Sequence, residues 1–157
     1  MPNLNELSAD DAEKELLACC ASRSFAREVA ALRPYADLAA LTAAAETAVR
    51  GLAWADVEEA LAAHPRIGER AEGADRESAW SRQEQSGVEE HLRQELAEGN
   101  RAYEERFGHV YLICATGLSG GQMLARLKER LANDPAIERE VVRDELAKIT
   151  KLRVAKI

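Results

Sequence analysis

Alanine is the residue that most constrains how this chain can fold. Thirty of the 157 residues are alanine, whereas only four are proline. Alanine has the highest intrinsic helix propensity, and its small side chain lets helices approach one another closely. Apolar residues also recur at helical spacing, as at Trp54, Val57 and Leu61. The sequence therefore predicts an all-α fold in which helices are joined by short breaks.

Helix-capping residues divide the chain into about eight predicted helices. Ser8 and Asp37 are good N-caps, because a short polar side chain can accept a hydrogen bond from an amide of the first turn. Ser24 is expected to begin a further helix. Asp134-Pro135 has the pattern of an N-cap followed by proline at the first helical position. Phe107-Gly108 predicts a C-terminal stop.

The apolar run Val110–Ala115 departs from the helical pattern. A continuous apolar run of this length fits a buried extended segment as well as a helix. We expect a short extended or irregular segment near residues 110–116, followed by a loop surrounded by Gly117, Gly120 and Gly121. Because no repeat or linker interrupts the chain, residues 1–157 are predicted to form a single compact domain.

Composition argues against several classes of protein. The net charge is −7, which argues against nucleic-acid binding, since that binding depends on Lys and Arg side chains that neutralise phosphates. No apolar run approaches the ~18–20 residues that cross a bilayer, and the polar, acidic N-terminus does not resemble a signal peptide. Cys19, Cys20 and Cys114 lack CxxC spacing and are expected to be buried thiols in a reducing cytoplasm.

His64-Pro65 is the first of three segments that could take part in catalysis or ligand binding. The histidine ends a predicted helix, and the proline after it restricts the backbone. An imidazole titrates near neutral pH, so it can give or take a proton during catalysis. The alternative is a structural role, in which a histidine at a helix C-terminus interacts favourably with the helix dipole. From spacing alone the structural role is the more frequent one.

The other two segments offer hydrogen-bonding groups. Ser81, Glu84 and Gln85 lie within one helical turn and could bind a small polar heterocycle through directed hydrogen bonds. Ser81-x-x-Glu84 also fits a capping box, which is a purely structural alternative. If residues 110–116 are extended, their backbone amides could bind an anionic or carbonyl oxygen. The alternative for that segment is a buried piece of core.

No sequence pattern predicts a metal or an organic cofactor. The three histidines show neither HxxxH nor HExxH spacing, and no cysteine pair has ligand spacing. The chain also lacks a GxxxxGKS/T phosphate loop and a GxGxxG motif. An enzyme built from these residues would work by acid–base chemistry and electrostatics, without a cofactor.

The order of the motifs resembles that of the 2-oxo-4-hydroxy-4-carboxy-5-ureidoimidazoline (OHCU) decarboxylase family, which performs the last enzymatic step from urate to (S)-allantoin. The resemblance spans nearly the whole chain. Its segments are Ala63-His64-Pro65-Arg66-Ile67-Gly68, Ser81-x-x-Glu84-Gln85, Asn100-x-x-Tyr103-x-x-Arg106-Phe107-Gly108 with Tyr111-Leu112-Ile113-Cys114-Ala115, and Glu145-x-x-x-Ile149-x-x-Leu152-Arg153. It implies an all-helical, typically dimeric enzyme that uses neither metal nor organic cofactor.

The resemblance also implies a role for each matching residue. His64 would be the catalytic histidine, and Pro65 would fix its position. Glu84 would be the second catalytic residue and would orient His64 or the substrate hydroxyl. The rest of the substrate-binding set would comprise Ser81, Gln85, the backbone amides of Leu112, Ile113, Cys114 and Ala115, and Arg153, which would meet substrate anionic charge. Without the resemblance, Arg153 would be interpreted as a solvated charge near a helix C-terminus.

Two other functions stay open at this point. One is a non-catalytic helical binding or adaptor protein, in which His64 and Glu84 only cap helices. The other is a hydrolase of a related ureide, which should require an activated water, usually bound to a metal. The preferred interpretation is a cofactor-independent decarboxylase that acts as a homodimer on a small molecule. The closing Ala155-Lys156-Ile157 differs from an SKL-type peroxisomal address, which favours the cytoplasm.

Overall fold

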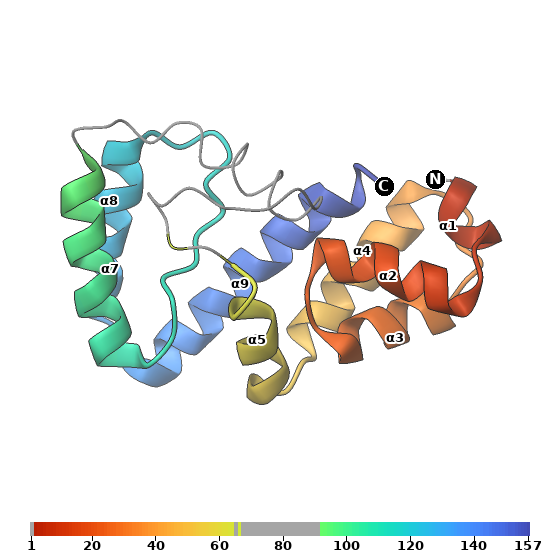
Figure 1. The fold of residues 1–157 in the computed structure, drawn as a ribbon, viewed down its shortest axis with the longest axis horizontal. Coiled ribbons are helices and arrows are strands. Elements are labelled where there is room, and N and C mark those ends of the chain that lie inside the picture. Colours follow the sequence, from red (N-terminus) through yellow and green to blue (C-terminus); the bar gives the residue numbers. More distant parts are fainter. Residues whose placement is uncertain (1, 65, 67–91) are drawn as a thin grey trace. The chain divides into compact units, whose positions relative to one another are not determined.

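A computed structural model describes residues 2–64, 66 and 92–157 (Figure 1). Within these ranges the backbone forms helices and contains no strand. The all-α prediction is therefore confirmed, with the predicted number of helices in the described part of the chain. They are α1 (Pro2–Glu6), α2 (Ala9–Cys19), α3 (Arg23–Ala31), α4 (Leu38–Arg50), α5 (Trp54–Leu61), α7 (Arg93–Phe107), α8 (Gly120–Arg130) and α9 (Pro135–Val154).

The chain divides into two compact units. Unit 1 contains Met1–Ala63 and Arg143–Ile157, and unit 2 contains His64–Val142. Helix α9 begins in unit 2 and ends in unit 1. The single domain over residues 1–157 stays a prediction. No helix of the described residues is both long enough and apolar enough to span a membrane.

In unit 1, α2 packs against α3 and α3 packs against α4 (Figure 1). The two predicted N-caps are confirmed: Ser8 accepts a hydrogen bond from the Asp11 amide at 3.1 Å, and Asp37 accepts one from the Ala40 amide at 2.8 Å. The helix predicted from Ser24 begins instead at Arg23. Its N-cap is Ser22, whose hydroxyl accepts a hydrogen bond from the Phe25 amide at 3.3 Å.

Helix α1 was not predicted from the sequence. Its five residues are too few to be stable alone, because nucleating a helix is costly. Contacts from a distant turn hold it in place. The Asn5 side chain donates to the carbonyl of Tyr35 and accepts from the amide of Tyr35, both at 2.8 Å. Arg33 Nη1 donates to the carbonyls of Leu4 and Leu7 at 2.8 and 2.7 Å.

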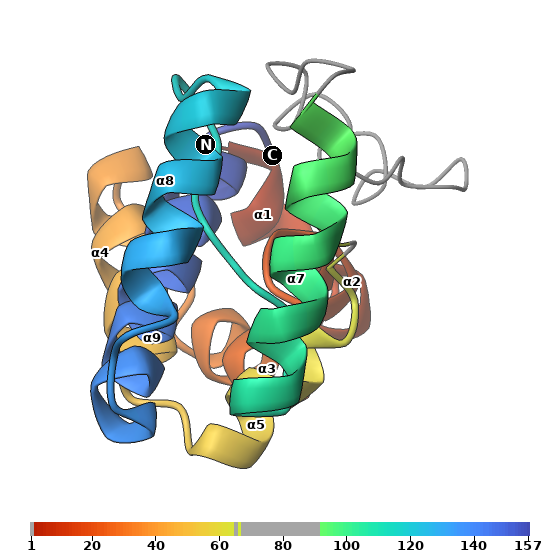
Figure 2. The same ribbon diagram turned by 90° about the vertical axis from the view of Figure 1, so that its left-hand side faces the viewer.

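In unit 2, α7 and α8 lie side by side, as Figure 2 shows. A Cβ at Gly99 would lie only 2.4 Å from Cδ2 of Leu127, so glycine permits the close approach of the two helices. The stop predicted at Gly108 is confirmed, since Gly108 caps α7 in the left-handed conformation with φ 81°. Among the described residues of this unit, one buried apolar cluster contains Leu96, Tyr103, Tyr111, Ile113, Ala115, Met123, Leu124 and Leu127.

The segment between α7 and α8 also follows the prediction in part. Residues 110–115 form no helix or strand, and Gly117 then turns the chain with φ 82°. Gly120 borders this loop, as predicted, but both Gly120 and Gly121 belong to the first turn of α8. The reason is a capping box: Gln122 N donates to Ser119 Oγ at 3.1 Å, and Ser119 N donates to Gln122 Oε1 at 2.8 Å.

Candidate functional site

The structure describes six of the ten predicted site residues. They are His64, Leu112, Ile113, Cys114, Ala115 and Arg153. Pro65, Ser81, Glu84 and Gln85 lie outside the described residues, so their roles stay predictions. His64 and residues 112–115 belong to unit 2, whereas Arg153 belongs to unit 1.

His64 lies beyond the end of α5. The helix ends at Leu61, and its last turn is closed by main-chain hydrogen bonds from the Ala62 and Ala63 amides. His64 is only 9% exposed, although it stands in a turn. Burial shields a side chain from bulk water, which suits a group that must pass a proton to a bound molecule and not to solvent.

Arg66 connects the chain after His64 to α7. Its Nε and Nη2 donate to Oε2 and Oε1 of Glu104 at 2.7 and 3.0 Å. This bidentate geometry fixes the orientation of the guanidinium as well as its position. The Arg66 side chain is 48% exposed, so the ion pair contributes only about 0–1 kcal/mol to stability. The ion pair joins Arg66 to α7.

A surface hollow of about 430 Å³ adjoins this ion pair. Its described lining consists of Arg66, Ala97, Arg101, Glu104 and Glu105. Two arginines and two glutamates balance one another in charge, so this lining does not select for an anionic ligand. The predicted site residues are not among the described residues of this lining.

The segment predicted to bind substrate through its amides is mostly buried. Leu112, Ile113 and Ala115 are 3–5% exposed, whereas Cys114 is only partly buried, contrary to the expectation of a buried thiol. A segment without its own helical hydrogen bonds must be held by its surroundings. Leu118 N donates to Ala115 O at 3.0 Å.

Two side chains hold the start of the same segment. The Tyr111 hydroxyl donates to the carbonyl of Met123 in α8 at 3.0 Å. Arg130, the last residue of α8, donates from Nη1 to the carbonyl of Leu112 at 2.6 Å. The extended segment is therefore attached to α8 at two successive residues.

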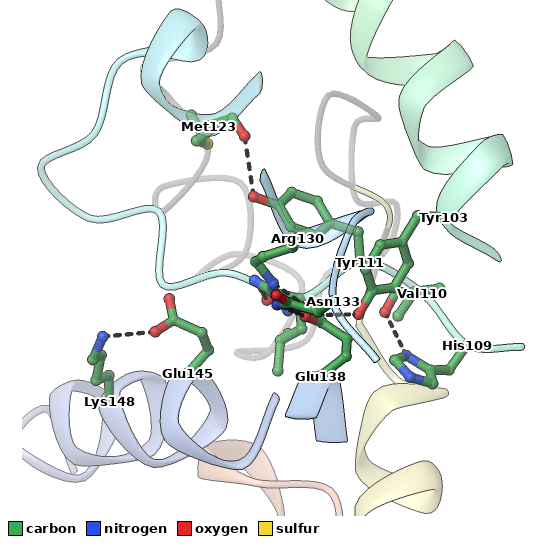
Figure 3. A network of polar contacts seen from close by, with 11 residues as sticks. Tyr103, His109, Val110, Tyr111, Met123, Arg130, Asn133, Glu138, Glu145 and Lys148 are labelled. Carbon is green, nitrogen blue, oxygen red and sulfur yellow. Dashed lines mark hydrogen bonds and ion pairs between the residues drawn. The ribbon is translucent and has the colours of Figure 1, made fainter. Parts of the chain in front are cut away.

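Arg130 belongs to a buried network centred on the carboxylate of Glu138, as Figure 3 shows. Glu138 lies in the first turn of α9 and is 0% exposed. Its Oε2 accepts from Arg130 Nε and Nη2 at 2.8 and 2.5 Å, and from the Tyr103 hydroxyl. Its Oε1 accepts from Asn133 Nδ2 at 3.1 Å. A carboxylate buried this deeply is tolerated only when donors satisfy its oxygens.

The surroundings keep Arg130 charged and Tyr103 neutral. Burial alone would lower the pKa of Arg130, but the hydrogen bonds and the negative charge of Glu138 raise it. Burial, and then the hydrogen bond to Glu138, raise the pKa of Tyr103, so its hydroxyl stays protonated and continues to donate. The Arg130 guanidinium carbon also lies 4.7 Å from the ring centroid of Tyr111, within the range of a cation–π contact. Leu112 therefore accepts its hydrogen bond from a permanent cation.

This network was not predicted from the sequence. Charged residues on amphipathic helices are usually solvent-exposed, so Arg130 and Glu138 carry no sequence signal of burial. The two residues lie on different helices, separated by a connection that includes Asn133, and no helical spacing relates them. The proximity of Glu138 to the start of α9 predicts only a favourable contact with the helix dipole.

In unit 1, Arg153 is 0% exposed. The alternative interpretation of Arg153 as a solvated charge is therefore wrong. Earlier on the same helix, Glu145 is 8% exposed and accepts a hydrogen bond from Lys148 Nζ at 2.6 Å (Figure 3).

The described residues offer no evident metal site. No group of three His, Cys, Asp or Glu side chains among them could hold a metal ion. Cys19 and Cys20 are buried in unit 1, as expected. The absence of a metal or cofactor from the chemistry stays a prediction, because part of the predicted site lies outside the described residues.

Known proteins resemble nearly the whole chain. Residues 5–155 match the sequence model of a family described as OHCU decarboxylase. The chain is 33% identical over 156 residues to the uric acid degradation bifunctional protein TTL of Arabidopsis thaliana, which covers 92% of this chain and 47% of that protein. It is 45% identical over 58 residues to the 2-oxo-4-hydroxy-4-carboxy-5-ureidoimidazoline decarboxylase of Amia calva, which covers 37% of this chain and 33% of that protein. The matched regions thus span half or less of these curated relatives.

Two solved structures share the fold. A crystal structure of OHCU decarboxylase in the presence of (S)-allantoin is similar with a TM-score of 0.78 and 32% identity, over 90% of this chain and 95% of that chain. A crystal structure of (S)-allantoin synthase is similar with a TM-score of 0.73 and 17% identity, over 98% of this chain and 52% of that chain. The second likeness concerns the fold alone.

Proposed function

Because this chain belongs to the OHCU decarboxylase family, we propose that it catalyses the decarboxylation of OHCU to (S)-allantoin in urate degradation. One observation carries the proposal. The chain is 32% identical to, and covers 95% of, a decarboxylase whose crystal structure was determined in the presence of (S)-allantoin. The test is to generate the unstable substrate in place from urate with the two upstream enzymes, and to follow the appearance of (S)-allantoin by circular dichroism.

The chemistry of the substrate makes a cofactor unnecessary. OHCU is a five-membered ring with a hydroxyl and a carboxylate on one carbon, next to an imine carbon that carries the ureido group. Loss of CO₂ leaves an electron pair, which the adjacent imine accepts. The ring thus supplies the electron sink that pyridoxal or thiamine provides in other decarboxylases. The protein has to hold the carboxylate out of the ring plane and to direct a proton to one face.

The proposed catalytic residues are His64 and Glu84. His64 would interact with the substrate at the carbon that carries the hydroxyl and carboxylate and would serve as proton donor or shuttle, and its burial supports this role. Glu84 would orient His64 or accept from the substrate hydroxyl, and Pro65 would fix the histidine. The proposed binding residues are Ser81 and Gln85, the backbone amides of Leu112, Ile113, Cys114 and Ala115, and the buried Arg153. We further propose that the chain forms a homodimer, acts in the cytoplasm and folds as one domain over residues 1–157.

Glu84→Gln separates the catalytic role of this residue from a helix-capping role. If Glu84 only completes a capping box with Ser81, glutamine also serves there and turnover stays intact, with a stability loss of at most about 1 kcal/mol. If Glu84 orients His64, the amide keeps the shape but loses the charge. We expect turnover to fall at least roughly tenfold, equivalent to ~1.4 kcal/mol of barrier, with little change in melting temperature. A variant with normal turnover and lowered melting temperature would assign Glu84 to the cap.

Exhaustive chelation should leave the activity unchanged. The sequence contains no metal-ligand spacing among its histidines and cysteines. The measurement is decarboxylation after dialysis against EDTA, with the upstream enzymes assayed separately as the control. Loss of activity that zinc or manganese restores would instead favour a metal-dependent hydrolase.

A further inference from the structure

We propose that Arg130 is a positioning residue that aims the backbone amide of Ile113 at the substrate. The inference rests on the proposed function, because it concerns the amides assigned to OHCU binding. Arg130 is 7% exposed and donates from Nη1 to the carbonyl of Leu112, which is 3% exposed, at 2.6 Å. The contact is therefore a charge-assisted hydrogen bond between a buried cation and the main chain of the extended segment.

The geometry of the peptide unit links the direction of the Leu112 carbonyl to that of the Ile113 amide. The peptide bond between these residues is trans. In a planar trans peptide the C=O and N–H groups point in opposite directions. Because the Leu112 carbonyl points toward Arg130, the Ile113 N–H must point away from Arg130. The hydrogen bond from Arg130 thus fixes the direction of one donor in the proposed binding segment.

The same contact strengthens that donor. A hydrogen bond from a cation draws electron density toward the carbonyl oxygen, and conjugation across the peptide makes the N–H more positive. Hydrogen bonds linked in this way polarise one another, and the effect is larger where water is excluded. The Ile113 amide is therefore both oriented and polarised before any ligand binds. Such a donor suits a carbonyl or anionic oxygen of the ureide substrate.

The guanidinium itself is held in one orientation. Arg130 uses Nε and Nη2 for Glu138, which leaves Nη1 for Leu112. Tyr103 and Asn133 in turn hold the Glu138 carboxylate. A planar guanidinium can serve both acceptors at fixed angles, whereas a lysine ammonium is a single point donor on a flexible stem. Stability alone does not explain this arrangement, because well-packed apolar residues often stabilise a core as well as a buried ion pair does.

The test compares Arg130→Lys with the wild-type chain. The lysine keeps the charge but cannot bind Glu138 through two N–H groups and Leu112 at the same time. We expect kcat/KM to fall roughly 10- to 100-fold, the size of effect expected when a binding group is displaced by about 1 Å. In an ¹⁵N-labelled sample, the Ile113 amide resonance should shift when (S)-allantoin is added to the wild-type chain, and should shift much less in Arg130→Lys.

Tyr35→Phe is the matched control. It removes a buried hydroxyl that donates to the Val29 carbonyl at 2.7 Å in unit 1, and it leaves the Arg130 network intact. We expect its melting temperature to fall while kcat/KM and the response of the Ile113 amide stay those of the wild type. If Arg130→Lys does not fold, Tyr103→Phe is used in its place, since it keeps the ring and removes one donor to Glu138. The expected effects are then in the same direction and smaller.

The outcomes separate this inference from the proposed function. If the wild-type chain produces no (S)-allantoin from OHCU, the proposed function fails and the inference falls with it. If the wild-type chain is active but its Ile113 amide does not respond to (S)-allantoin, the inference alone is overturned. Unchanged kcat/KM in a folded Arg130→Lys, or in Tyr103→Phe where that variant replaces it, would overturn the inference in the same way.

Discussion

Replacement of His64 by asparagine should remove most of the turnover and leave the helices intact. A positioned proton donor or acceptor is typically worth ~10²–10⁴-fold in rate. Asparagine can still form hydrogen bonds but cannot exchange a proton near neutral pH. Because His64 lies beyond the end of α5, the helical circular dichroism should not change. The measurement is the steady-state rate of OHCU decarboxylation beside a thermal melt.

A second histidine provides the control for this experiment. His109 is partly buried in unit 2, where its ring lies 5.4 Å from that of Tyr103. It has no proposed part in the reaction, so His109→Asn should retain most of the turnover. Near-normal production of allantoin by a folded His64→Asn would contradict the proposed role of His64.

Replacement of Arg130 by methionine should destabilise the chain strongly. The change leaves the Glu138 carboxylate, which is 0% exposed, without its cation. Breaking a buried ion pair by removing one partner typically costs about 3–5 kcal/mol. The measurement is the free energy of unfolding from urea titration. An Arg130→Met variant as stable as the wild type would show that the ion pair does not contribute to stability.

The double variant Arg130→Met with Glu138→Leu is the companion to this prediction. Removing both charges together avoids an unpaired buried carboxylate, and such replacements are often neutral or stabilising. We expect the double variant to recover much of the lost free energy of unfolding. It still lacks the hydrogen bond to Leu112, so its kcat/KM should remain low. The second substitution should therefore restore the free energy of unfolding without restoring kcat/KM.

Much of the helical fold follows from local signals. The caps at Ser8 and Asp37 and the stop at Gly108 depend on one residue and its immediate neighbours, and all three are confirmed. The helix expected from Ser24 is capped instead by Ser22, which the local sequence does not distinguish from Ser24 as a cap. Helix α1 could not be predicted, because it is held by Asn5 and its contacts with a turn thirty residues away.

The candidate site likewise has some features that follow from local sequence and others that depend on contacts between distant residues. Residues 110–115 form neither helix nor strand, and the continuous apolar run marks this segment in the sequence without deciding between an extended segment and a helix. The attachment of Leu112 to Arg130 depends on two helices meeting, and no local pattern records it. The burial of Arg153 is likewise a tertiary property, since a terminal basic residue is usually solvated.

The most direct test of the central claim is the handedness of the allantoin that this chain produces. Urate is converted in place to OHCU by the two upstream enzymes, and circular dichroism is recorded with and without this chain. In water a proton can reach either face of the ring, so the uncatalysed reaction gives racemic allantoin without a dichroic signal. We predict that the chain accelerates the loss of OHCU and yields the signal of (S)-allantoin alone. Racemic allantoin, formed at the same rate with and without the chain, would contradict the proposed function.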